Sequence, residues 1–206
     1  WPTFEVANQA AIVSIHKGFT KYTAAAGIPE LRAEIAKLTS KDLGLTYTAN
    51  QTIVAPGAKY VIYALLQMLV NPGEEVIIHS PYWVSYPVMA ELAGAAVKIV
   101  TCDEKVNFKL TPDALEKAIT ANSRVLILCS PSNPTGIAYT RAELAALAAV
   151  IKKHPKLMVI SDDIYNKLIF NESEVLAPHI LQAAPELREQ VIVVSGASKT
   201  YSMTGW

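Results

Sequence analysis

The sequence predicts an α/β protein in which a three-layer α/β/α domain is built around a mostly parallel β-sheet. Two patterns support this prediction. Short β-branched apolar runs recur along the chain, and helix-like segments separate them. The 206 residues are 51% hydrophobic and 17% charged, so the chain is long enough and apolar enough to bury a sizeable core.

The predicted strands are short runs that are apolar on both faces. Such runs are typical of strands buried in a parallel sheet, because helices cover both sides of that sheet. The runs are EVIIHS (75–80), AVKIV (96–100), RVLILCS (124–130), LMVIS (157–161) and VIVVS (191–195).

The predicted helices lie between these runs. They span residues 57–70, 85–94, 111–120 and 140–154. Two of them begin with a capping signal: Thr111 directly precedes Pro112, and Thr140 precedes Glu143 by three residues.

The first 50 residues have a different organisation. They contain two predicted helices, 7–17 and 29–38, and no clear strand precedes Ile53. We therefore divide the chain into residues 1–50, an N-terminal helical segment that is an arm or the start of a smaller domain, and residues 51–206, the large domain.

Composition argues against several classes of function. Lys plus Arg and Asp plus Glu both number 18, so no net charge attracts nucleic acid or an anionic membrane. Apolar stretches such as residues 60–70 are shorter than the roughly 18 residues that span a bilayer. Cys102 and Cys129 have no CxxC spacing, which fits reduced core thiols in a cytoplasmic protein.

Metal, nucleotide and serine-hydrolase sites are not predicted either. The sequence has no P-loop, GxGxxG or GxSxG motif. The histidines show no metal-ligand spacing; they are His16, His79, His154 and His179.

Polar residues follow several predicted strands, at the edge where parallel sheets bind ligands. We expect these strand ends to converge on one crevice. The segments are Pro81-Tyr82-Trp83, Asn133-Pro134-Thr135-Gly136, Asp162-Asp163 and Ser198-Lys199.

Two of these residues suggest specific chemistry. Lys199 follows an apolar strand among small residues, which favours a partly desolvated amine suited to Schiff-base formation. Asp162 ends a buried strand, so its carboxylate needs a cation or hydrogen-bond donors. It either caps the next turn or holds a cationic ring nitrogen.

The neighbouring segments supply further candidate contacts. Tyr165 offers a hydroxyl, and Asn133 is either an amide donor or a turn residue before Pro134. Trp83 is either a core residue or a plate on which a flat ring stacks.

A phosphate site is predicted where Pro56-Gly57-Ala58-Lys59 opens a helix, because backbone N–H groups there favour an anion. Together with the strand-end residues, this segment fits a planar, phosphorylated aldehyde with a cationic ring. Pyridoxal 5'-phosphate meets each of these requirements.

An ordered set of motifs resembles class I aminotransferases of fold type I, in particular the aspartate and prephenate aminotransferase branch. The resemblance covers nearly the whole chain. The motifs are KYTAAAGIPELR (21–32), APGAKYVIYALL (55–66), SPYWVSYP (80–87), CSPSNPTG (129–136), SDDIY (161–165) and SGASKTYSMTGW (195–206).

The resemblance implies roles around the cofactor ring. Lys199 would form the Schiff base with pyridoxal phosphate and then carry the proton between substrate and cofactor. Asp162 would keep the pyridine nitrogen protonated. Asn133 and Tyr165 would hydrogen-bond the phenolic oxygen, and Trp83 would stack on the ring.

The resemblance also implies contacts to the phosphate and to a second subunit. Gly57, Ala58, Lys59 and Ser198 would surround the phosphate. Tyr22 would reach the phosphate of the neighbouring subunit, which implies a homodimer with shared active sites. Residues 1–50 would then include the dimer-contact arm, and residues 51–206 would be the cofactor-binding domain.

The sequence departs from the family pattern at three points. The motif usually reads Asp-Glu where this chain has Asp162-Asp163, a change that we expect to matter little for the cofactor contact. Gly196 stands where some relatives have a phosphate-binding serine. The family arginines that bind phosphate and substrate lie beyond TGW, so we expect a partial chain that lacks most of the small domain.

The resemblance implies that the partners are small molecules, namely amino acid and 2-oxo acid substrates. Lys59 matches a lysine associated with the side-chain carboxylate of acidic substrates, although it could serve only the phosphate. Trp83 and Asn133 would complete the substrate contacts. We favour aspartate as donor and 2-oxoglutarate as acceptor, with prephenate as an additional acceptor. Aromatic, alanine or methionine aminotransferases, a non-catalytic regulator of the same fold and an inert fragment remain alternatives.

Overall fold

The computed structural model describes residues 1–170 and 175–206. The chain forms two compact parts, which are treated separately. One consists of residues 1–57 with 196–206, and the other of residues 58–195.

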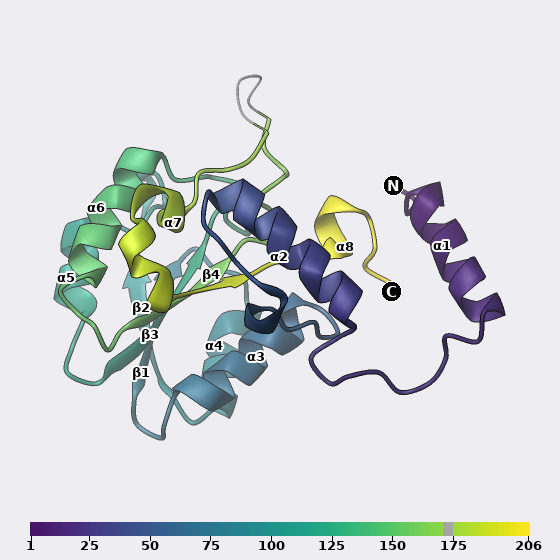
Figure 1. The fold of residues 1–206 in the computed structure, drawn as a ribbon. Coiled ribbons are helices and arrows are strands. Elements are labelled where there is room, and N and C mark those ends of the chain that lie inside the picture. Colours follow the sequence, from purple (N-terminus) through teal and green to yellow (C-terminus); the bar gives the residue numbers. More distant parts are fainter. Residues whose placement is uncertain (171–174) are drawn as a thin grey trace. The chain divides into compact units, whose positions relative to one another are not determined.

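The part formed by residues 58–195 contains a sheet of five parallel strands in the order β2-β1-β3-β4-β5 (Figure 1). The predicted strands are therefore confirmed, with bounds that differ by a residue at some ends. They are β1 (Glu75–Ser80), β2 (Ala96–Thr101), β3 (Ser123–Cys129), β4 (Met158–Asp162) and β5 (Val191–Val194).

The order of the strands reverses direction between β1 and β3. From β1 the chain first adds β2 on one side, and then places β3, β4 and β5 on the other. Such a switch point separates the loops that leave two adjacent strands, and in open α/β sheets ligands bind there, beyond the carboxyl ends of the strands.

Helices cover both faces of the sheet, which confirms the layered architecture (Figure 1). One face carries α3 (Ala58–Leu69) and α4 (Ser85–Leu92). The other carries α5 (Pro112–Ala118), α6 (Arg141–Ile151) and the short α7 (Ile180–Ala183). Single 3₁₀ turns span Glu104–Val106 and Pro185–Glu189.

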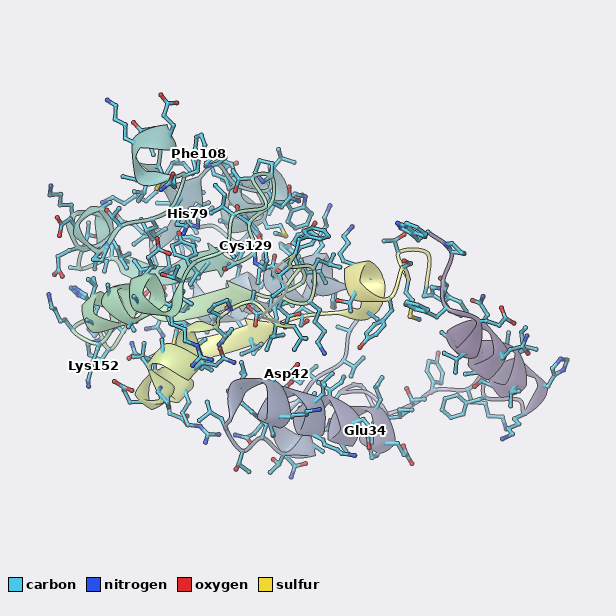
Figure 2. The ribbon with its side chains drawn as sticks, turned by 90° about the horizontal axis from the view of Figure 1, so that it is seen from above. Glu34, Asp42, His79, Phe108, Cys129 and Lys152 are labelled. Atoms are coloured by element: carbon cyan, nitrogen blue, oxygen red, sulfur yellow. The ribbon has the colours of Figure 1, made fainter. Side chains whose placement is uncertain are left out.

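Successive side chains of a strand point to opposite faces of the sheet, and in these strands both sets are apolar. Val76 and Ile78 of β1 belong to the core that packs against α3 and α4, whereas Ile77 between them points to the opposite face. All three are at most 1% exposed. Figure 2 shows His79 and Cys129, each 4% exposed, inside the body of this part.

The predicted capping signals start two of the helices. The Thr111 hydroxyl accepts a hydrogen bond from the backbone N–H of Ala114 (3.3 Å), with Pro112 in the first turn of α5. Thr140 and Glu143 form a reciprocal capping box at α6, with bonds of 3.2 and 2.7 Å.

The part formed by residues 1–57 and 196–206 contains α1 (Glu5–His16), α2 (Pro29–Leu43), a 3₁₀ turn (Ala49–Gln51) and α8 (Ala197–Thr200). The two predicted helices of this segment are confirmed, although α2 extends to Leu43. Near the two ends of the chain, the Thr3 hydroxyl donates to the carbonyl of Ser202 (2.6 Å) and accepts from the Trp206 indole N–H (3.0 Å).

No helix within residues 1–170 and 175–206 is both long enough and apolar enough to cross a membrane.

Candidate active site

The predicted site residues of the part formed by residues 58–195 follow the carboxyl ends of neighbouring strands. Trp83 comes shortly after β1, Asn133 after β3, and Asp162 is the last residue of β4. Asp162 pairs in register with Cys129 on one side and Val194 on the other. Because the strands are parallel, their ends share one edge of the sheet, as the sequence predicts.

Asp162 is a buried carboxylate with neutral partners. Its side chain is 3% exposed, accepts the Tyr86 hydroxyl at Oδ2 (2.5 Å) and accepts the backbone N–H of Ile164 at Oδ1 (3.3 Å). Burial raises the pKa of Asp162 above its usual value, and these two hydrogen bonds only partly oppose the rise. The site therefore favours a cationic ligand that can supply the missing positive charge.

An aromatic surface lies next to this carboxylate. The Trp83 ring meets the Tyr86 ring edge to face, with centroids 5.4 Å apart and an interplanar angle of 89°. The Lys59 ammonium lies 4.8 Å from the centroid of the Trp83 ring, a cation–π contact. Lys59, Trp83, Tyr86 and Asp162 thus form one connected series of contacts.

Asn133 and Tyr165, which the sequence places as two candidate ligands of one cofactor oxygen, contact each other. The Asn133 amide donates to the Tyr165 hydroxyl (3.3 Å), although 32 residues separate the two in the chain. Burial raises the pKa of Tyr165, so its hydroxyl stays protonated at neutral pH and can donate to an acceptor. Both side chains line a pocket of about 610 Å³.

Two other titratable groups near these strand ends are neutral at neutral pH. Burial raises the pKa of the Cys129 thiol to about 12, and the nearby charge of Asp162 adds to this rise. Burial lowers the pKa of His79 to about 4. Cys129 is thus a protonated core thiol rather than a nucleophile, as the sequence suggests.

The predicted phosphate segment has the open backbone that an anion needs. Gly57 has φ of +88°, and a Cβ at this position would meet nothing within 4 Å. The helix α3 begins directly afterwards, at Ala58. The first N–H groups of a helix have no partner within the helix, so this start offers free donors.

Tyr22, Ser198 and Lys199 lie in the part formed by residues 1–57 and 196–206. Ser198 and Lys199 belong to α8, which follows β5 along the chain. Within this part of the chain α8 has no buried residue and Lys199 is exposed. The partial desolvation of Lys199 stays a prediction. Tyr22 is fully exposed, at 107%.

Sequence reasoning missed two contributors to this site. Tyr86 belongs to the motif SPYWVSYP and lies in the first turn of the predicted helix 85–94, three residues after Trp83, and this short spacing could have indicated that the two rings meet. Asp163, which we expected to matter little, is 3% exposed and bonds to Ser161 and His179 on the other side of β4.

Comparison with known proteins agrees with this arrangement. Residues 2–206 match the family model of class I and II aminotransferases. An aspartate/prephenate aminotransferase from Cereibacter sphaeroides is 47% identical over 197 residues, which cover 96% of this chain and 49% of the relative.

Solved structures give the same result. The crystal structure of an aspartate aminotransferase from Rhizobium meliloti has a TM-score of 0.96 and 37% identity, and the match covers 100% of this chain and 51% of that one. An aspartate aminotransferase from Thermus thermophilus with maleate has a TM-score of 0.93 and 38% identity, covering 100% and 52%. The chain spans about half the length of these relatives, and it belongs to the class I and II aminotransferase family.

Proposed function

We propose that the full-length protein is a pyridoxal phosphate-dependent aminotransferase that moves an amino group from an acidic amino acid to a 2-oxo acid. The observation that carries this proposal is the buried Asp162 carboxylate at the edge of the sheet, whose two hydrogen-bond donors are neutral. Members of this family use pyridoxal phosphate.

The residues present fit this cofactor. A protonated ring nitrogen would give Asp162 the cation that its burial demands. Asn133 and Tyr165 supply donors for the phenolic oxygen, and Trp83 supplies a flat face. Gly57, Ala58, Lys59 and Ser198 would surround the phosphate, Ala58 and Lys59 through backbone N–H groups at the start of α3. The Gly57 N–H itself donates to the Ala55 carbonyl (2.7 Å), so Gly57 would contribute an open backbone without a side chain.

When bound, the cofactor supplies an electron sink for the bond that breaks at the substrate α-carbon. The chain's own residues do the rest. Asp162 would hold the proton on the ring nitrogen, which would keep the ring electron-poor. Lys199 would hold the cofactor covalently, and its amine, when free, would take the proton from the substrate α-carbon.

An acidic donor is favoured by the position of Lys59. Its ammonium lies over the Trp83 ring and is exposed, so it can pair with a second substrate carboxylate. The Thermus thermophilus relative was solved with maleate, a dicarboxylate. We therefore propose aspartate or glutamate as donor, with 2-oxoglutarate as acceptor and prephenate as an additional acceptor.

A homodimer with shared active sites is also proposed. Tyr22 is fully exposed, and α1 has no buried residue. Its apolar side chains Val6, Val13 and Ile15 are 78%, 47% and 65% exposed. A second copy of the chain would cover these apolar side chains and receive Tyr22 at its phosphate site. In this proposal residues 1–50 are the dimer-contact arm and residues 51–206 bind the cofactor.

The test is a donor and acceptor panel with the full-length enzyme. Aspartate, glutamate, phenylalanine, alanine and methionine would each be paired with 2-oxoglutarate and with prephenate. We expect the highest kcat/KM for the two acidic donors. Preferred use of a neutral donor would refute the substrate assignment. Absence of amino-group transfer from every donor would refute the assignment as an aminotransferase and favour a non-catalytic regulator.

A further inference from the structure

Three polar side chains are buried on the face of β4 opposite Asp162. They are Ser161, Asp163 and His179, which are 3%, 3% and 5% exposed. Side chains alternate between the two faces of a strand, so the neighbours of Asp162 on both sides point away from it. The strand end that presents Asp162 is therefore anchored from the opposite face.

Hydrogen bonds fix the protonation of this cluster. The His179 Nδ1 accepts the backbone N–H of Leu181 (3.0 Å), so this nitrogen carries no proton. The ring then has its proton on Nε2, whose hydrogen-bond partner is the Ser161 hydroxyl oxygen at 3.1 Å. The same nitrogen lies 3.1 Å from Asp163 Oδ2. The Ser161 hydroxyl in turn donates to Asp163 Oδ1 (2.7 Å), so His179 supports Asp163 through Ser161 as well as by this close approach.

The cluster is not a nucleophilic Ser-His-Asp site. His179 Nε2 does lie 3.1 Å from the Ser161 oxygen, but the Ser161 proton is directed to the carboxylate of Asp163. The ring nitrogen that a triad carboxylate would orient, Nδ1, is used by a backbone N–H. All three side chains are also buried. The bonds join secondary-structure elements and leave no group free to react.

His179 connects two elements that are distant in the chain. It is the N-cap residue of α7, and its backbone N–H donates to the side chain of Gln182 (3.1 Å). Asp163 continues the sheet beyond β4, because its N–H donates to the carbonyl of Val194 (2.7 Å). The contacts of His179 Nε2 with Ser161 and Asp163 therefore tie the start of α7 to the end of β4.

We propose that His179 is a positioning residue for Asp162. Its Nε2–H group contacts Ser161 and Asp163 and so holds the end of β4 from the opposite face, which sets the direction of the Asp162 carboxylate and of Tyr165 three residues later. This inference rests on the proposed cofactor role of Asp162. The negative charge of Asp163 also raises the pKa of Asp162. Donors near the Asp163 carboxylate offset part of that charge and so favour the ionised form of Asp162.

Two substitutions separate positioning from helix capping. In His179→Asn the amide oxygen stands near the place of Nδ1, so the cap of α7 is kept, but no donor reaches Asp163. In His179→Gln the amide nitrogen stands near the place of Nε2, so the donor to Asp163 is kept and the cap is lost. The readout is the Kd of pyridoxal phosphate for the cofactor-free full-length enzyme, measured by fluorescence titration.

We expect His179→Asn to weaken cofactor binding about 10-fold or more, the usual size of such supporting contacts, and His179→Gln to stay within about 3-fold of wild type. The opposite order, or equal weakening in both variants, would overturn the proposal. If His179→Asn does not fold, ¹⁵N NMR of labelled histidine in the wild-type enzyme decides: a proton on Nδ1 of His179 would overturn it. A wild-type enzyme that binds no cofactor would instead refute the proposed function.

Discussion

The hydroxyl of Tyr86 donates a 2.5 Å hydrogen bond to the carboxylate of Asp162, and both side chains are 3% exposed. Tyr86 lies in α4, which follows β1, whereas Asp162 ends β4, so the bond joins both sides of the switch point in the sheet. A neutral donor orients the carboxylate without neutralising it. A cationic ligand would supply the positive charge that these neutral donors do not.

Tyr86→Phe should weaken binding of pyridoxal phosphate to the full-length enzyme. The lost bond leaves Asp162 Oδ2 buried without a donor and raises the pKa of Asp162 further, because this bond lowers it. A hydrogen bond to a charged group contributes about 1.5–3 kcal/mol, so we expect about a 10- to 100-fold rise in Kd. Fluorescence titration of the cofactor-free enzyme measures it.

Tyr139→Phe is the matched control for that variant. Tyr139 is 2% exposed, and its hydroxyl accepts the backbone N–H of Leu110 (2.7 Å) away from Asp162. Its loss should lower stability while leaving the cofactor Kd unchanged. Equal weakening of cofactor binding by both variants would show that Tyr86 acts only through packing.

Asp162→Asn should make the cofactor-free enzyme more stable at neutral pH. Burial raises the folded-state pKa of Asp162 above the ordinary value of 3.8, so ionisation lowers stability as the pH rises from 3.8 through the folded-state pKa, and the loss is complete above it. The variant should therefore have a higher unfolding free energy than wild type at pH 7, and this gain should vanish as the pH falls below about 4. Urea unfolding over a pH series tests this, and a gain that persists at low pH would contradict it.

The strands and the edge of the sheet that carries the site could be predicted from the sequence. Runs such as VIIH in β1 are apolar on both faces, and the residues that end that pattern must lie at the sheet edge. Asp162 and Asn133 are found there.

Contacts between elements could not be predicted in the same way. The bond from His179 to Asp163 spans 16 positions of the chain, and no period of a helix or strand links them. The helix α7 was missed for a related reason: its N-cap is a histidine, which is not among the usual capping residues, and only four residues follow it. Exposure of Lys199 also depends on how α8 packs, which flanking small residues do not determine.

Lys59→Gln should lower selectivity for acidic donors. The Lys59 ammonium over the Trp83 ring is the proposed partner of the substrate's second carboxylate. Loss of one charge-assisted contact of about 1.5–3 kcal/mol predicts about a 10- to 100-fold fall in kcat/KM for aspartate. The value for phenylalanine should change little. Lys37→Gln, at a lysine 77% exposed in α2, is the control; equal losses for both donors would show that Lys59 serves only the phosphate.

Gly27→Ala should destabilise the part formed by residues 1–57 and 196–206. Gly27 has φ of +98°, and a Cβ there would lie 2.8 Å from the Val54 Cβ, so the substitution adds both strain and a clash. We expect a loss of about 2–4 kcal/mol in unfolding free energy. Gly44→Ala, with φ of +70° and open space, should lose only about 1 kcal/mol. Urea unfolding of the two full-length variants compares them, and equal losses would argue against the clash with Val54.

The most direct test of the central proposal is to locate the covalent cofactor. The full-length enzyme, loaded with pyridoxal phosphate, would be reduced with borohydride, digested and sequenced by mass spectrometry. We predict that the cofactor is attached to Lys199, within SGASKTYSMTGW, and that Lys199→Ala yields no labelled peptide. Attachment to a different lysine, or no attachment in the wild-type enzyme, would contradict the proposed role of this site.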